Sequence, residues 1–572
     1  MTTGLEIKDY NSWQLPLISD YVRKWAKQTP TNDALISAET GQRFSYREFD
    51  EASDLYAMAL TKMGLTKGDI LVTQFLAVPE FFLLIYGCLK AGVIISPVDI
   101  RLQPHEVVRD IGKVQAKAFF CPGTTPMKDF TEVVQAVRQA CPSIAHIVQW
   151  MPFGLPEEMA EGSLGFDSLF GEEALDALRQ DTALKDAVRS VENALTTRDP
   201  ALIIFTTGTT GDPKPALLCH ENILINNMVA GRGASLYGTN FRLLNVMPTS
   251  HVAGTSQGPM SAWFAGGSVC SMGFFSPDKA MEALATHRST FIGGVPTHFR
   301  MLWALPDYEF YDRSSLRFAL YGGSAVDTAF LEQLAEMSPL FGTAYGMTES
   351  GGFFSATPKG LSVSEMSGQV GQFFPDLAPV TIRKPMNPDG TAGEEVAKGE
   401  VGEICVEGGI VFLGYVNNEE ATRACRTTEG ILYTGDMGSL KPMGGYEAIV
   451  FAGRRKFVIK PKGYLVFPDE VADHLTRHPK VSQAQVVGAP HDLFTDGVFA
   501  FVQPTEEGCV TEEELAAHCK QIASYKRPCH VHFWPVGEQF PVNKVNKVDL
   551  LTLTHQAEAI VEELRQQGGW DR

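Results

Sequence analysis

The sequence predicts a layered α/β protein with a large N-terminal domain and a small C-terminal domain. Three observations support this prediction. Apolar strand-like runs alternate with amphipathic stretches, the chain has 572 residues, and a glycine-rich turn at residues 442–445 interrupts the pattern. Alternating strands and helices favour parallel sheets covered by helices, and chains of this length usually divide into domains.

Short apolar runs at residues 70–73, 94–98, 118–120 and 201–205 predict strands of the large domain. Amphipathic stretches at 45–63 and 104–114 predict helices between them. The most apolar segment, 81–98, contains Lys90, Gly92 and Pro97, so it predicts a buried helix and a strand rather than a membrane span. Residues 151–192 are acidic and partly glycine-rich, and we expect a surface excursion there.

The domain boundary is predicted at residues 453–456, shortly after the glycine-rich turn. About 115 residues follow, with their own alternation of strand and helix patterns, enough for a small α+β domain. We therefore divide the chain into an N-terminal domain, 1–453, and a C-terminal domain, 454–572.

Composition restricts the classes of function. The 48 basic and 67 acidic residues leave a net charge of −19, which disfavours a nucleic-acid partner. The first residues lack a basic region followed by an apolar run, so we expect no signal peptide and a cytoplasmic protein. Among the ten cysteines there is no C-x-x-C pair, and the Cys and His residues at 509–532 fit no familiar zinc spacing.

A loop rich in hydroxyls and glycine follows the apolar strand at 201–205. Its residues are Thr206, Thr207, Gly208, Thr209, Thr210, Gly211 and Lys214. Glycine lets backbone N–H groups turn toward an anion, threonines add donors, and the lysine adds positive charge. The loop predicts a phosphate cradle that lacks the Walker spacing. An ordinary polar turn is the alternative if this loop is taken alone.

Five segments in register resemble the signature motifs of the adenylate-forming superfamily: acyl-CoA synthetases, firefly luciferase and peptide-synthetase adenylation domains. They are the loop at 206–214, the Tyr-Gly-Met-Thr-Glu-Ser run at 345–350, the Tyr-Thr-Gly-Asp run at 433–436, and residues 453–464 and 541–547. Residues 44–46 and 87–92 also resemble this family, so the likeness covers nearly the whole chain. It implies that the small C-terminal domain is a mobile lid.

The resemblance implies a two-step activation of a small-molecule carboxylate. A carboxylate oxygen attacks the α-phosphate of ATP and pyrophosphate leaves; a thiol, usually that of coenzyme A, then attacks the acyl-adenylate and AMP leaves. ATP, Mg²⁺ and coenzyme A are therefore the expected cofactors. Fatty acid metabolism is a natural setting, and relatives are monomers or homodimers.

The resemblance also assigns nucleotide-binding roles. The loop residues would hold the β- and γ-phosphates, with Pro215 standing where glycine is usual. Thr348 would contact the α-phosphate and Glu349 would bind magnesium. The adenine pocket and its motif would comprise Gly322, Gly323, Ser324, Tyr345, Gly346 and Met347.

Asp436 would accept hydrogen bonds from the ribose, and Arg454 would reach the ribose or a phosphate. Simpler alternatives exist for three of the nucleotide-site residues taken alone. Glu349 fits a solvated position beside a helix cap, Tyr345 fits core packing, and Asp436 fits ordinary turn chemistry.

Lys547 is the expected catalytic lysine for adenylation, with Lys544 as a less well-spaced alternative. Asn546 replaces a common glycine. Lys456 would be the hinge about which the lid rotates after adenylation. In the second state Lys460 and Gly463 would face the active site. Phe457 departs from the family's polar residue without explanation.

The expected acyl pocket comprises His251, Val252, Gly254, Gly294, Val295, Gly323 and Gly346. Two roles suit His251 equally well: a gate at the carboxylate end of the acyl pocket, or a structural histidine. Peptide-synthetase relatives use an aspartate near this region, and residues 247–260 contain none, which argues against an amino-acid substrate. An apolar acid follows: fatty, aromatic or alicyclic.

We conclude that the sequence predicts an AMP-forming carboxylate–CoA ligase. Two alternatives are kept. One is an adenylating enzyme with another acceptor, either carrier-protein pantetheine or oxygen as in luciferase. The other is a nucleotide-binding homologue without turnover.

Overall fold

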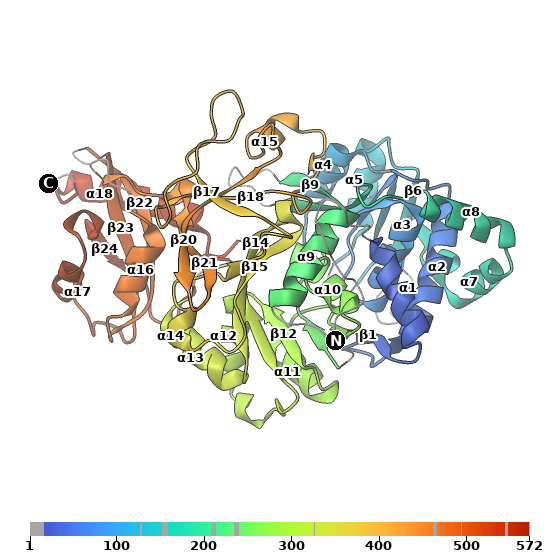
Figure 1. Cartoon of the computed structure of the whole chain (residues 1–572), viewed down its shortest axis with the longest axis horizontal. Helices are drawn as coiled ribbons and strands as arrows, with labels where there is room; N and C mark the ends of the chain where they lie inside the picture. Colours follow the sequence, from blue (N-terminus) through green and yellow to red (C-terminus); the bar gives the residue numbers. More distant parts are fainter. Residues whose placement is uncertain are drawn as a thin grey trace.

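The computed structural model describes residues 16–125, 128–151, 158–206, 213–233, 240–324, 326–461, 466–492, 495–543 and 547–570. Figure 1 shows a small C-terminal domain on the left and a much larger N-terminal domain in the centre and on the right. Two mixed sheets with helices form the large domain, and one three-stranded sheet forms the small domain. The prediction of an α/β protein with a large and a small domain is confirmed.

The first sheet has eight strands, and its parallel part matches the strand-like runs in the sequence. In spatial order they are β19 (Gly414–Tyr415), β9 (Lys214–Cys219), β8 (Pro200–Thr206), β4 (Ile94–Pro97), β3 (Ile70–Thr73), β5 (Ala118–Pro122), β6 (His146–Trp150) and β7 (Leu164–Gly165). Strands β8, β4, β3, β5, β6 and β7 are parallel. Strand β9 returns antiparallel to β8.

Helices cover this sheet. They are α1 (Ile18–Gln28), α2 (Tyr46–Lys62), α3 (Pro79–Ala91), α4 (Pro104–Val114), α5 (Thr131–Ala140), α6 (Asp167–Phe170), α7 (Glu172–Arg179), α8 (Thr182–Asn193) and α9 (His220–Gly233). Pro79 occupies the first turn of α3, and Gly92 ends the helix in a left-handed conformation with φ of 70°. The predicted buried helix and strand at 81–98 are confirmed as α3 and β4.

In its described part, 158–192, the surface excursion expected at 151–192 is mostly exposed, and it is helical. This segment forms β7 and helices α6 to α8, which pack against α2 and α3. Phe166, Phe170 and Leu178 are buried in the same core as Tyr56. The acidic composition of this segment did not indicate these helices, because each short helix turns only one narrow apolar face inward.

The second sheet has thirteen strands, and six of them form a parallel run. In spatial order they are β17 (Val380–Arg383), β18 (Gly402–Val406), β20 (Leu432–Met443), β21 (Tyr446–Arg454), β16 (Gln372–Phe373), β15 (Gly352–Ala356), β14 (Phe341–Met347), β13 (Phe318–Tyr321), β12 (Phe291–Gly294), β10 (Arg242–Asn245), β11 (Ser268–Ser271), β1 (Asp33–Ser37) and β2 (Arg43–Ser45). Strands β1, β11, β10, β12, β13 and β14 are parallel to their neighbours in this run. The remaining strand pairs of the sheet are antiparallel.

Further helices pack on or beside this sheet. They are η2 (Val252–Gly254), α10 (Pro259–Phe264), α11 (Pro277–Thr286), α12 (Pro296–Trp303), η3 (Tyr308–Phe310), α13 (Thr328–Met337), η4 (Thr348–Ser350) and α14 (Val363–Met366). Helix α15 (Glu419–Arg423) packs against β19 of the first sheet.

The C-terminal domain begins after η5 (Arg455–Phe457). Its sheet contains β22 (Val481–His491), β23 (Thr495–Pro504) and β24 (His530–Phe533), and its helices are α16 (Pro468–Thr476), α17 (Glu512–His518), η7 (Cys519–Gln521), η8 (Ser524–Lys526) and α18 (Leu550–Gln566). Alternate residues of β23 enter different cores. Val498 and Ala500 pack with α16, whereas Phe499 and Phe501 pack with α18. Both faces of the sheet are therefore covered.

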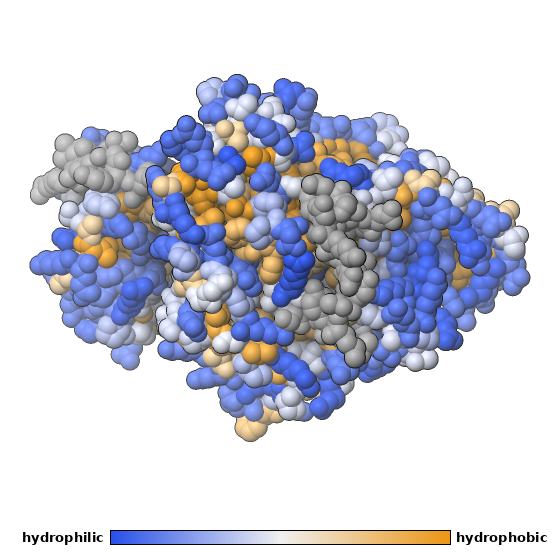
Figure 2. Space-filling view, in the orientation of Figure 1, coloured by the Kyte–Doolittle hydropathy of each residue, from blue (hydrophilic) through white to orange (hydrophobic). Residues whose placement is uncertain are grey.

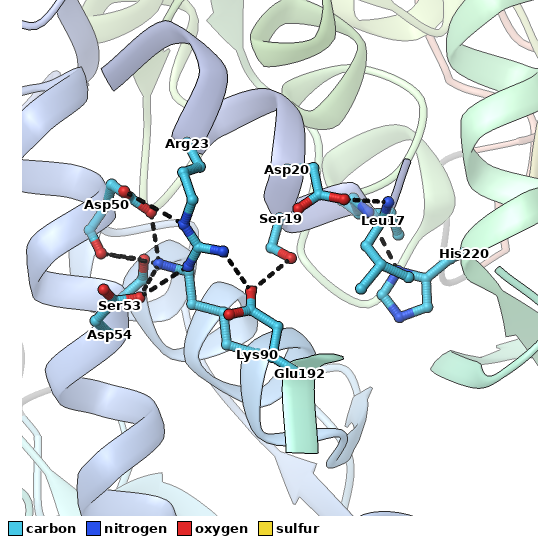
Figure 3. A network of polar contacts seen from close by, with 11 residues as sticks. Leu17, Ser19, Asp20, Arg23, Asp50, Ser53, Asp54, Lys90, Glu192 and His220 are labelled. Atoms are coloured by element: carbon cyan, nitrogen blue, oxygen red, sulfur yellow. Dashed lines mark hydrogen bonds and ion pairs between the residues drawn. The ribbon is translucent and has the colours of Figure 1, made fainter. Parts of the chain in front are cut away.

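Four helices of the large domain are joined by a network of charges, drawn in Figure 3. Lys90 of α3 is fully buried, and its Nζ lies 2.6 Å from Oδ1 of Asp50 and 2.5 Å from Oδ1 of Asp54, both on α2. Arg23 of α1 contacts the same two carboxylates and donates to Oε1 of Glu192 on α8 at 2.9 Å. The network fixes the register of α1, α2, α3 and α8.

We expect Lys90→Met to lower the stability of the protein by about 2 kcal/mol, because two carboxylates lose their buried counter-charge. The estimate is below that for a fully buried pair because the Asp54 side chain is 39% exposed. Thermal unfolding measures the change, and Lys62→Met, at an exposed residue in the last turn of α2, is the matched control. Equal melting temperatures for the two variants would contradict the role given to Lys90.

Candidate active site

The carboxyl ends of three neighbouring parallel strands form one side of the site. Gly294 ends β12, Gly322 follows β13, and Tyr345 lies near the end of β14. The N–H of Gly322 donates to the carbonyl of Gly294 at 3.0 Å, which joins two of these ends. Such strand ends are the usual location of binding sites in α/β sheets. The predicted Gly322, Gly323, Ser324 and the 345–349 motif thus lie on adjacent segments.

Asp436 is the best-defined polar group of the site. It pairs in register with Arg454 across β20 and β21, and its Oδ1 lies 2.9 Å from Nε of Arg454. The hydroxyl of Tyr345 donates to Oδ2 at 2.8 Å. The carboxylate is 3% exposed, and burial raises its pKa, while Arg454 opposes that rise. Oδ1 is buried and accepts no hydrogen bond of regular geometry, so it can still accept one from a ligand hydroxyl.

Tyr345 packs edge-on against Phe354, with ring centroids 4.8 Å apart. The ring of Phe451 is a second aromatic neighbour, with its centroid 6.2 Å from that of Tyr345. Phe354 is fully buried, so the core-packing alternative for Tyr345 describes part of its surroundings. The Tyr345 hydroxyl nevertheless orients Asp436. This hydrogen bond joins two motifs that lie far apart in the sequence.

Lys547 of the C-terminal domain reaches the end of β13 in the N-terminal domain. A Cβ on Gly323 would lie 3.1 Å from Nζ of Lys547, 2.8 Å from its Cε and 3.3 Å from Cγ1 of Val295. Gly323 has a φ of 90°, which glycine adopts without strain. The pKa of Lys547 is lowered to about 8, chiefly by burial and also by the positive charge of Arg454, while Asp436 opposes both. Any side chain at residue 323 would displace the lysine.

His251 faces the same region and is neutral. Burial, together with the positive charge of Lys547, lowers its pKa to about 3. Its Nδ1 accepts a hydrogen bond from the N–H of Ala253 at 3.1 Å, at the start of η2. The neutral ring therefore carries its proton on Nε2, and it presents a donor rather than a charge.

Glu349 lies in η4 and connects to the phosphate loop through Tyr415. The hydroxyl of Tyr415 donates to Oε1 of Glu349, and Nζ of Lys214 lies 5.5 Å from the Tyr415 ring centroid. Glu349 is 6% exposed, and burial raises its pKa. A buried carboxylate close to Lys214 suits a divalent cation, because the cation would offset the cost of burying the negative charge.

The two ends of the phosphate loop are held side by side. Thr206 of β8 pairs with Lys214 of β9. The predicted loop residues Thr207, Gly208, Thr209, Thr210 and Gly211 lie outside the described residues, as does Gly463. Thr348 begins η4 and follows Met347, the last residue of β14.

The expected acyl-pocket residues lie close to these groups. Val252 and Gly254 are buried in η2, and Val295 follows β12. Two of the glycines allow close packing: a Cβ on Gly254 would lie 2.1 Å from the carbonyl oxygen of Pro248, and one on Gly346 would lie 2.0 Å from that of Gly352. These glycines therefore serve backbone packing, not only the room for a ligand that the sequence suggested.

Two predicted residues are not brought to this cluster. Lys456 lies in η5 and is exposed, with its Nζ 5.7 Å from the Phe457 ring centroid. The N–H of Lys460 donates to Oδ2 of Asp496 within the C-terminal domain at 3.0 Å. The lysine of the C-terminal domain that lies beside Gly323 is therefore Lys547 and not Lys460.

Sequence reasoning missed three residues of the site region. Tyr415 contacts Glu349. Glu403, 2% exposed, accepts from the N–H of Gly435 at 2.9 Å and from Nη1 of Arg455 at 2.8 Å. Asp469 of α16 is the third. No spacing in the sequence links these residues to their partners, which are contributed by other strands and by the second domain.

In the described part of the chain, no group of three or more His, Cys, Asp or Glu residues could hold a metal ion, and all ten cysteines are free thiols. A site at Glu349 would therefore use one protein carboxylate together with ligand oxygens, as magnesium commonly does. No helix among the described residues is both long and apolar enough to cross a membrane.

Comparisons with known proteins agree on one family. A family model described as AMP-binding enzyme matches residues 22–416, and one described as AMP-binding enzyme C-terminal domain matches residues 470–544. The medium-chain acyl-CoA ligase ACSF2, mitochondrial, of Macaca fascicularis is 27% identical over 93% of this chain and 86% of its own length. The 4-coumarate–CoA ligase 3 of Oryza sativa subsp. japonica is 26% identical over 90% and 88%.

Solved structures show the same fold. ATP-bound MatB from Rhodopseudomonas palustris has a TM-score of 0.76 and 24% identity, with 95% of this chain and 100% of that chain covered. The anthranilate CoA ligase AuaEII in complex with anthranoyl-AMP has a TM-score of 0.78 and 20% identity, covering 97% and 100%.

Proposed function

The protein belongs to the AMP-binding enzyme family and is an AMP-forming acid–thiol ligase, and on this basis we propose that it activates an apolar carboxylic acid with ATP and magnesium and transfers the acyl group to free coenzyme A. A single observation supports the proposal most strongly. Lys547 from the second domain meets Gly323, Asp436 and Arg454 of the first.

In the first step two anions must approach each other, the carboxylate and the α-phosphate. Lys547 lowers the repulsion between them and aligns the attack, and Thr348 donates to the α-phosphate. Asp436 holds the ribose through Oδ1, and Arg454 opposes the rise in the pKa of that carboxylate that burial causes. Thr206, Lys214 and the loop between them hold the departing pyrophosphate. Glu349 would hold the magnesium ion, which supplies further positive charge at the phosphates.

In the second step the C-terminal lid, which follows the hinge at Lys456, rotates relative to the N-terminal domain. Lys547 then leaves the carbonyl, and Lys460 and Gly463 come to face the site, where the thiol of coenzyme A attacks. Lys456 and Lys460, at the start of the C-terminal domain, are both exposed, which suits residues whose surroundings change in such a rotation.

The substrate acid is apolar because residues expected to line the acyl pocket are apolar. Val252 and Val295 flank His251 and Gly323, and no acidic side chain is available between residues 247 and 260 to hold an amino group. Neutral His251 would donate from Nε2 to the carboxylate. Relatives named for medium-chain acyl and coumarate substrates are compatible with a fatty or an aromatic acid. We also propose a cytoplasmic location and a monomer or homodimer.

Pyrophosphate release across a panel of acids tests the proposal. The panel runs from acetate to palmitate and includes benzoate and cyclohexanecarboxylate, each with ATP and magnesium, with and without coenzyme A. We expect sustained turnover only with an apolar acid and coenzyme A together. Release of about one equivalent, not increased by coenzyme A, would instead indicate another acceptor. Tight ATP binding without release would indicate a non-catalytic homologue.

The pH dependence of adenylation should reflect Lys547. Its pKa is lowered to about 8, so the cation is present below that pH and is lost as pH rises through it. We expect kcat/KM for ATP, which reports on the free enzyme, to fall above about pH 8. Lys547→Arg keeps its charge at high pH and should flatten this limb. A wild-type profile that stays level to about pH 10 would contradict the role of Lys547.

A further inference from the structure

Residues 409–416, which we call the bridging segment, join the strand that follows the phosphate loop to the motif that carries Glu349. The N–H of Phe412 donates to the carbonyl of Glu349 at 2.9 Å, and the N–H of Val416 donates to the carbonyl of Pro215 in β9 at 2.9 Å. Elements β9 and α15 flank this segment at the upper middle of Figure 1, and Figure 2 shows hydrophobic residues gathered next to this part of the same face. The backbone of one segment therefore fixes η4 relative to β9.

Tyr415 makes the corresponding connection between side chains. It pairs with Ala216 across β19 and β9. Its hydroxyl donates to Oε1 of Glu349, and Nζ of Lys214 lies 5.5 Å from its ring centroid. An ammonium at such a distance over an aromatic ring is attracted by the ring. One tyrosine thus contacts both the expected magnesium ligand and the lysine of the phosphate loop.

Tyr415 is held in place by its own neighbours. Its N–H donates to Oγ1 of Thr422 in α15 at 2.9 Å. Its ring packs edge-on against the fully buried ring of Phe412, with centroids 4.9 Å apart. A phenol fixed in this way limits how far the carboxylate bonded to it can turn. Because Glu349 is buried, little water is available to replace this hydrogen bond.

We propose that Tyr415 is a positioning residue that sets Glu349 and Lys214 for the magnesium complex of ATP. The inference rests on the proposed function, in which Glu349 holds the metal ion and Lys214 holds the phosphates. The hydroxyl orients the carboxylate and the ring supports the ammonium, so the two contributions can be removed one at a time. AMP has neither the β- nor the γ-phosphate, so its binding should depend on neither contribution.

Calorimetric binding of magnesium–ATP and of AMP to the full-length enzyme tests the inference. We expect Tyr415→Phe, which keeps the ring and loses the hydroxyl, to raise Kd for magnesium–ATP about fivefold, the size of one hydrogen bond to a charged group. Tyr415→Leu loses both contacts and should raise this Kd about 15-fold. In both variants Kd for AMP should stay within about twofold of wild type, which general damage to the fold would not allow.

The metal dependence of the first half-reaction gives a second readout. The magnesium concentration at half-maximal carboxylate-dependent ATP–pyrophosphate exchange should rise about three- to fivefold in Tyr415→Phe. The matched control is Tyr446→Phe at the start of β21, where the lost hydroxyl accepts a hydrogen bond from Nε2 of Gln369 at 3.0 Å. This control should match wild type in nucleotide binding and in metal dependence.

A wild-type Kd for magnesium–ATP in Tyr415→Phe, or an equal weakening of AMP binding, would overturn the inference. Wild-type enzyme without carboxylate-dependent exchange would overturn the proposed function instead. Binding requires no acid and no turnover, so the comparison of magnesium–ATP with AMP would still decide the role of Tyr415.

Discussion

Replacing Lys547 by alanine should reduce adenylation about 10²- to 10³-fold, the size expected when a preorganised charge at the reacting centre is lost. Of the three atoms nearest a Cβ on Gly323, two belong to this lysine of the C-terminal domain. Its ammonium compensates two anions in the first step, and alanine leaves them to repel each other.

The second half-reaction provides the internal control for this variant. Thioester formation from supplied acyl-adenylate should survive in Lys547→Ala, because the lysine has left the carbonyl by then. Lys544→Ala, at the neighbouring lysine of the same motif, should leave both steps near wild-type rates. Persistent ATP–pyrophosphate exchange in Lys547→Ala would show that another residue performs the role.

Asp436→Asn should raise KM for ATP and lower kcat/KM for ATP about 50-fold, with a smaller effect on kcat. The carboxylate offers Oδ1 as an acceptor to the ribose, and it also pairs with Arg454 and with the Tyr345 hydroxyl. An amide keeps one acceptor and leaves the arginine without its counter-charge.

Deoxynucleotides identify the contact that is lost. Wild-type enzyme should prefer ATP over the 2′- or 3′-deoxy analogue, whichever hydroxyl Asp436 holds, by about tenfold, and Asp436→Asn should lose that preference. Tyr345→Phe removes a donor to Oδ2 and keeps the carboxylate, so it should retain the preference with a milder rise in KM. Equal discrimination by wild type and Asp436→Asn would contradict the ribose contact.

The parts of the fold that could be predicted from sequence are those set by local pattern. Buried strands such as 70–73 read as apolar runs, and α3 is delimited by Pro79 and Gly92. The α-helices of 158–192 were missed because a short amphipathic helix under an acidic surface resembles a polar loop in composition. Phe170 and Leu178 become informative only once their packing partners are known.

The site was predictable where a motif supplies its own neighbours. Thr206 and Lys214 meet because β8 and β9 are adjacent strands, and Asp436 meets Arg454 because β20 and β21 form a hairpin. Residues that act through tertiary contacts were not predictable. Tyr415 reaches Glu349 from 66 residues away, and Asp469 reaches the site only because the second domain packs on Gly453.

The central claim is that a carboxylate oxygen attacks the α-phosphate of ATP, and the fate of that oxygen tests it most directly. The acid that is active in the panel would be labelled with ¹⁸O in its carboxylate and turned over with ATP and coenzyme A, and the products analysed by mass spectrometry. The account predicts AMP that carries one labelled oxygen and unlabelled pyrophosphate. Unlabelled AMP, or ADP with label in inorganic phosphate, would contradict an acyl-adenylate intermediate.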